Sequence, residues 1–82
     1  DSKAMKLAAF EYCRQGNQYM RMMYRGKDAG KWAQLAMATF RESRKALEKI
    51  VSQKPDDDEA QRMLHGVVLG IQMVNKDGPL FY

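Results

Sequence analysis

The sequence is poor in cysteine, histidine and proline: one Cys, one His and two Pro occur in 82 residues. A single cysteine cannot pair within the chain, so a disulfide framework is excluded as the support of this small fold. A zinc site needs about four Cys or His ligands, more than the chain contains. We therefore expect no metal, no cofactor, and a reducing compartment, either the cytoplasm or, as the alternative, the nucleus.

Long apolar runs are absent as well. No stretch approaches the roughly 18 to 20 apolar residues that a membrane span requires, and the beginning lacks the pattern of a secretory signal. We expect a soluble chain with no transmembrane segment that is not exported. Because it begins with Asp1 rather than Met, we also expect a fragment of a longer protein or the product of a removed leader.

Residues that could carry catalysis are few. Nucleophilic catalysis needs a base near the nucleophile and a third group that orients the base. Cys13 falls beside the main apolar stripe of its segment, which favours a packed thiol over a reactive one. His65 falls on the same side as Gln61 and Gln72, which favours a solvated surface position. We predict no catalytic residue and no enzymatic activity for this chain alone.

What the sequence does contain is helical periodicity. Hydrophobic residues make up 45% and charged residues 29%, which is the balance of a folded soluble domain. Apolar positions recur with the 3.6-residue period in three stretches, and no useful β alternation occurs. We predict one all-α domain over residues 1–82, a three-helix antiparallel bundle with helices at about 2–26, 30–54 and 56–75 and a tail or linker at 76–82.

Turn residues mark the boundaries of these helices. Gly26 to Gly30 contains two glycines and Asp28, a candidate cap for the second helix. Lys54-Pro55 ends the second helix, and the acidic run that follows is typical of a helix start. A divalent-metal cluster is the alternative for that run, but the loop spacing of an EF-hand is missing. Gly16 either lies within a continuous first helix or breaks it into two.

Residues 19 to 25 form the first candidate partner-binding surface, because they are apolar around most of the helix circumference. One core-facing stripe cannot bury all of them. Either the other helices and Leu80, Phe81 and Tyr82 of the tail cover them, or they form a methionine-rich groove for a partner. The candidate binding residues are Tyr19, Met20, Met22, Met23 and Tyr24.

A second candidate surface lies on the third predicted helix. At about 100° per residue, Gly66, Leu69, Gly70 and Met73 gather on one small apolar face. Two glycines four residues apart would let another helix approach closely. That helix is either the first helix of this chain, or a partner helix or second copy of the chain.

The charge is unevenly distributed along the chain. Residues 1 to 54 contain twelve Lys or Arg against five Asp or Glu, whereas residues 55 to 82 contain two against five. The basic part favours an acidic peptide, a nucleic acid or an anionic lipid as partner. The candidate anion contacts are Arg21, Arg25, Arg41 and Arg44. No nucleic-acid recognition motif accompanies them.

The segment from Pro55 to Ala60, followed by Leu64, resembles the junction between tetratricopeptide repeats. Ala8, Ala9, Tyr12 and Gly16 are similar to the small, aromatic and turn-glycine positions of such a repeat. In size and helix number the chain also resembles the microtubule-interacting-and-trafficking domains. Both resemblances imply a helical module that recognises a short peptide in a groove between helices.

These observations support three functional hypotheses. The first is an adaptor or scaffold module that binds a helical or short peptide in an inter-helix groove. The second is a basic module that binds nucleic acid or anionic lipid. The third is an oligomerisation or regulatory domain of a larger enzyme.

Overall fold

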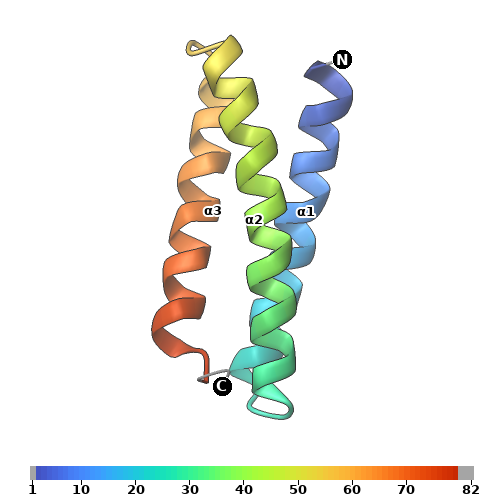
Figure 1. Ribbon diagram of the computed structural model, residues 1–82, viewed down its shortest axis with the longest axis vertical. Helices are drawn as coiled ribbons and strands as arrows, with labels where there is room; N and C mark the ends of the chain where they lie inside the picture. The colour runs from blue at the N-terminus through green and yellow to red at the C-terminus, as the bar shows by residue number, and fades with distance from the viewer. Residues whose placement is uncertain (1, 80–82) are drawn as a thin grey trace.

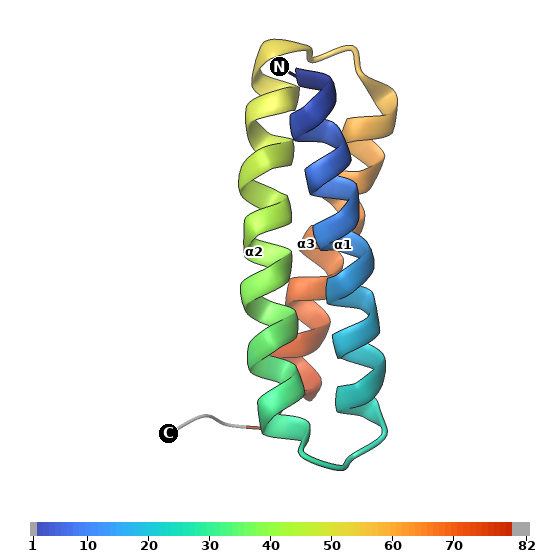
Figure 2. The same ribbon diagram turned by 90° about the vertical axis from the view of Figure 1, so that its right-hand side faces the viewer.

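Three long helices make up the described part of the chain, residues 2–79 of the computed structural model. They are α1 (Ser2–Tyr24), α2 (Ala29–Gln53) and α3 (Asp58–Asp77), and no strand occurs within these residues. Successive helices run in opposite directions, so α1 and α3 are parallel to each other and both pack on α2 (Figure 1, Figure 2). The predicted all-α three-helix antiparallel bundle is confirmed.

The helix α1 is continuous through Gly16, so the alternative of a break at this glycine is wrong. Gly16 is buried, and a Cβ built there would lie 2.6 Å from the Phe40 ring of α2. The glycine is therefore needed for close approach to Phe40 and not for a turn.

The turn between α1 and α2 uses two left-handed residues. Gly26 has a φ of 88°, a backbone conformation that glycine adopts without steric cost, and its N–H donates to the Met23 carbonyl oxygen. Asp28 precedes α2 with a φ of 54°, but its side chain makes no capping hydrogen bond. Asp28 thus occupies the predicted cap position without acting as a side-chain cap.

The helix α3 begins two residues later than predicted, because Asp57 is the residue that caps it. The Asp57 Oδ1 accepts a hydrogen bond from the Ala60 N–H at 3.1 Å. Lys6 of α1 donates to the same carboxylate at 2.8 Å and lies 3.0 Å from Glu59. The acidic run is therefore a helix start that also ties α3 to α1.

The Lys6 ammonium and the Ala60 N–H hold the pKa of Asp57 below its ordinary value. A lowered folded-state pKa contributes stability that is present above the unfolded pKa of about 3.9 and is lost as the pH falls through the lowered value. Asp57→Asn keeps a side chain that can cap but removes the charge. We expect a lower urea midpoint for this variant at pH 7.

A measurement at low pH is the control for the comparison of wild type with Asp57→Asn. The difference between wild type and Asp57→Asn should disappear once the pH is well below the lowered pKa, because both side chains are then neutral. Asp56→Asn changes an exposed carboxylate in the same loop and should leave the midpoint nearly unchanged at either pH. If the urea midpoints of all three proteins depended on pH in the same way, the lowered pKa of Asp57 would not be a source of stability.

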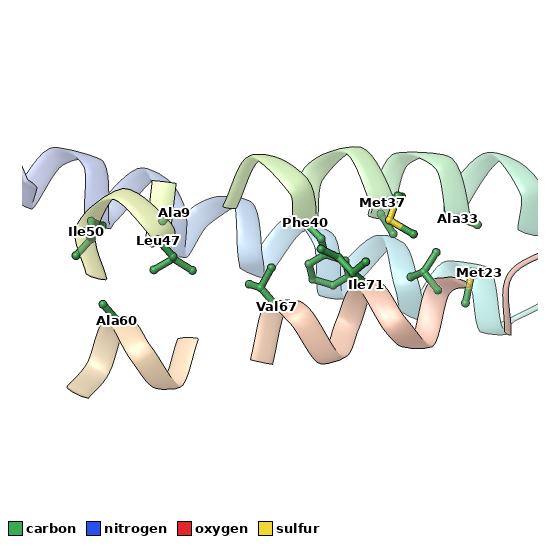
Figure 3. Packing of buried hydrophobic residues seen from close by; sticks show 12 residues of the cluster. Ala9, Met23, Ala33, Met37, Phe40, Leu47, Ile50, Ala60, Val67 and Ile71 are labelled. Carbon is green, nitrogen blue, oxygen red and sulfur yellow. The ribbon is translucent and has the colours of Figure 1, made fainter. Parts of the chain in front are cut away.

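The core runs along the middle of the bundle and is centred on α2 (Figure 3). Phe40 is 1% exposed and points from α2 between the other two helices, where a Cβ built at Gly70 of α3 would lie 2.8 Å from its ring. The buried hydrophobic residues are Ala9, Met23, Ala33, Ala36, Met37, Phe40, Leu47, Ile50, Ala60, Val67, Ile71 and Val74.

Small and polar residues complete this core. Ser43 is fully buried, and its hydroxyl donates to the Ala9 carbonyl oxygen at 2.8 Å. This bond pairs the polar group of Ser43, which would otherwise be costly to bury. The 3.6-residue period predicts burial of Tyr12 in α1 and Leu35 in α2, but both are exposed. Ala33, Met37 and Ser43 are buried on α2, although the same period does not include them.

The end of α3 also differs from the prediction. Residues 76 and 77 belong to the helix, so the predicted tail at 76–82 is too long by at least these two residues. Leu80, Phe81 and Tyr82, which we expected to help cover residues 19–25, lie outside the described residues.

Candidate functional site

The first candidate surface, at the carboxyl end of α1, is largely used within the bundle. Met23 is 3% exposed and belongs to the core, so its predicted role in partner binding is wrong. Tyr19 stacks on Trp32 of α2 with ring centroids 5.9 Å apart, and Met20 and Met22 are half-buried. Only Tyr24, at 49% exposure, keeps a large accessible apolar area.

The residues of the second candidate surface differ in exposure. Gly70 faces inward and is buried against Phe40, so it cannot contact a partner as predicted. Leu69 and Met73 are 46% and 43% exposed, although both are large and apolar. Gly66 is exposed, and a Cβ built there would meet nothing within 4 Å. We call Gly66, Leu69 and Met73 the α3 strip.

Tyr24 of the first candidate surface is hydrogen-bonded to the carboxyl end of α3. The Tyr24 hydroxyl donates to Asp77 Oδ2 at 2.6 Å, across the ends of α1 and α3. This bond raises the pKa of Tyr24, because loss of the phenolic proton would place a negative charge beside the carboxylate. Met73 lies one turn before Asp77, so the ring of Tyr24 lies at the end of the α3 strip.

The four candidate anion contacts do not form one site. Arg25 lines a hollow of about 400 Å³ with Met22, Lys27, Asp28 and Trp32. Arg41 lines a different hollow, of about 260 Å³, between α2 and Asn75 of α3. Arg21 is exposed on α1, and Arg44 is half-buried on α2. Neither hollow brings two of these arginines together.

A hollow of about 710 Å³ lies between α1 and α2, and no sequence pattern predicted it. Met5 and Tyr12 line it from α1, whereas Ala46 comes from α2. Its rim carries Lys45 and Lys49 together with Glu42 and Glu48. Because the two sides come from segments some 40 residues apart, no local pattern could have indicated it. Its rim is balanced in charge, and Lys45 is already paired with Glu42 at 3.4 Å.

Cys13 and His65, the residues considered for catalysis, lie where their patterns predict. Cys13 is half-buried, and burial raises the pKa of its thiol, which disfavours the reactive thiolate. His65 is exposed beside Asp58, Gln61 and Arg62. Within residues 2–79 no three His, Cys, Asp or Glu side chains are grouped so that they could hold a metal ion.

No family model, curated protein or solved structure matches this chain. The resemblances to tetratricopeptide repeats and to microtubule-interacting-and-trafficking domains therefore stay predictions. The segment around Pro55 does join two helices, as the first resemblance implies, but Gly16 lies inside a helix and not at a turn.

No helix in residues 2–79 combines the length and the apolar character that crossing a membrane requires.

Proposed function

We propose that this chain is a non-catalytic protein-interaction module, of adaptor or scaffold type, that binds a helical partner along α3. The observation that carries the proposal is the exposure of the α3 strip. Leu69 and Met73 are one turn apart and leave much of their apolar surface in water, while the core of the bundle is complete without them. Covering such surface on binding is favourable by roughly 25 cal/mol per Å².

Gly66 adds the geometry that a partner helix needs. The space in front of its Cα is open, so a large side chain of a partner could enter between the turns that carry Arg62 and Leu69. Helical partners are commonly recognised through such i, i+3, i+4 and i+7 positions on an amphipathic face. The proposed contact between a partner helix and α3 is therefore centred on Leu69 and not on Gly70.

The proposed module works without catalysis and in a reducing compartment. The chain has one cysteine, whose thiol is kept protonated by partial burial, and it needs no disulfide to close its core. These properties suit the cytoplasm or the nucleus, where thiols stay reduced.

The test is a selection of helical peptides from a displayed random library on the immobilised wild-type chain. The double substitution Leu69→Glu/Met73→Glu should lower the affinity for the selected peptides at least tenfold, because it places two charges in the apolar seam. The melting temperature should change little, since both residues are exposed.

Leu35→Glu is the matched control, because Leu35 is a similarly exposed leucine on α2. It should leave peptide binding unchanged. Peptides that bind the Leu69→Glu/Met73→Glu variant as well as they bind wild type would contradict the proposal. A concentration-dependent dimer in sedimentation, lost in the same variant, would also contradict it by assigning the strip to self-association.

A further inference from the structure

The α3 strip is bracketed by two cations. Arg62, Gly66, Leu69, Met73 and Lys76 follow one another at spacings of four, three, four and three residues. At 100° per residue these positions stay on one side of the helix, and all five residues are exposed. The two charges are fourteen residues apart, about 21 Å at 1.5 Å per residue.

Neither cation is neutralised by an ion pair within residues 2–79. Arg62 donates from Nε to the backbone oxygen of Asp58 at 3.4 Å, a weak bond that leaves the rest of the guanidinium free. Asp77, the carboxylate next to Lys76, accepts from the Tyr24 hydroxyl. The ion pairs of the described residues lie elsewhere, at Lys6, Arg14 and Lys45.

A second copy of the chain fits this pattern poorly. If two α3 strips packed antiparallel, Arg62 of each would lie opposite Lys76 of the other, and the Asp77 carboxylate beside that lysine would offset only part of the repulsion between the two cations. If they packed parallel, each cation would face its own copy. Such juxtapositions cost free energy in a contact that excludes water, so the strip disfavours self-pairing.

We propose that the occupant of the α3 strip is an amphipathic helix with an apolar seam of about four turns and a carboxylate at each end of that seam. This inference rests on the proposed function and specifies the chemistry of the partner. Two carboxylates about 21 Å apart would pair with Arg62 and Lys76. A large apolar side chain between them would enter the open space at Gly66.

A membrane surface matches the strip less well than a peptide does. Interfacial helices bury a broad apolar face that is rich in large residues. Here the apolar centre consists of Leu69 and Met73, and the third member of the strip is a glycine. A glycine adds no apolar area for a lipid phase, but it removes a steric barrier to another helix.

The experiment uses a displayed library of about 18-residue amphipathic helices with a fixed apolar seam and randomised residues at both seam ends. Selection on wild type should enrich Asp or Glu at both ends. A selected peptide, synthesised and followed by fluorescence anisotropy, should lose at least tenfold in affinity on Arg62→Glu/Lys76→Glu. Arg21→Glu/Lys49→Glu makes the same change in net charge at exposed sites off the strip, and should shift the affinity less than threefold.

The outcomes separate this inference from the proposed function. Peptides that need Leu69 and Met73 but carry neutral or basic ends would overturn the charge pattern and leave the proposed function standing. Peptides that ignore Leu69 and Met73 would overturn both. Binding to phosphatidylserine vesicles that is lost in Leu69→Glu/Met73→Glu, without enrichment of acidic peptides, would replace the peptide with a membrane surface.

Discussion

Phe40→Ala is expected to remove a large part of the stability of the chain. Truncation of a buried phenylalanine costs about 3 to 5 kcal/mol, through lost burial and the cavity that remains. At about 0.05 to 0.15 kcal/mol per residue, an 82-residue domain has only about 4 to 12 kcal/mol in total. Circular dichroism at 222 nm during thermal and urea unfolding measures the loss.

The size of this effect follows from the position of the ring. Phe40 enters the space between α1 and α3, and it lies against two buried glycines, Gly16 and Gly70, that bring both helices close to α2. Removal of the ring therefore opens a cavity shared by all three helices, and backbones held apart by the rest of the core cannot collapse to fill it.

Two comparisons make the Phe40 result specific. Phe40→Leu keeps most of the apolar volume and should cost clearly less than Phe40→Ala. Leu7→Ala removes an exposed leucine and should leave the midpoint within about 0.5 kcal/mol of wild type. A Phe40→Ala protein that melts like Leu7→Ala would contradict the central position of the ring.

The existence and order of the helices could be predicted because period, glycines and prolines agree. The start of α3 could not be placed as well, because Asp56, Asp57 and Asp58 can each cap a helix. Lys6 pairs with Asp57 across 51 positions of sequence, and this long-range contact accompanies capping by the second of the three. Local propensity does not contain that information.

The apolar period of α2 predicts a buried stripe of Trp32, Leu35, Ala36, Thr39, Phe40, Leu47, Ile50 and Val51, and only Ala36, Phe40, Leu47 and Ile50 of these are fully buried. Leu35 and Thr39 are apolar or small enough to suggest burial, yet Ala33, Met37 and Ser43 are the residues that face the other helices. In a three-helix bundle each helix contacts two neighbours, so its buried sector is wide and its centre depends on the packing of both. Small residues such as Ala33 are buried because a neighbouring backbone comes close, which hydrophobicity alone does not indicate.

The two glycines of the candidate site show the same limit of prediction from sequence patterns. Gly66 and Gly70 differ by only about 40° around α3. One is open to solvent and the other faces Phe40, a residue on a different helix. The sequence could therefore indicate an apolar face on α3, but it could not say which of its members were already used by the core.

Gly16→Ala and Gly66→Ala, the same chemical change in two helices, are expected to shift stability in opposite directions. Alanine is favoured over glycine within a helix by about 1 kcal/mol, so Gly66→Ala, where the added methyl meets open space, should stabilise the chain by up to that amount. At Gly16 the methyl would lie 2.6 Å from two atoms of the Phe40 ring. Overpacking of this kind costs about 1 to 3 kcal/mol, which exceeds the gain in helix propensity.

The ring cannot simply move away from a methyl at Gly16, because Gly70 approaches it from the other helix. Combining Gly16→Ala with Phe40→Leu should therefore cost less than the sum of the two single changes, with a coupling of about 0.5 to 3 kcal/mol in urea unfolding. Additive costs, or a Gly16→Ala protein as stable as Gly66→Ala, would show that the close approach of α1 to Phe40 does not exist in solution. A double-variant cost below that sum would support the assignment that glycine at position 16 lets α1 approach the Phe40 ring closely.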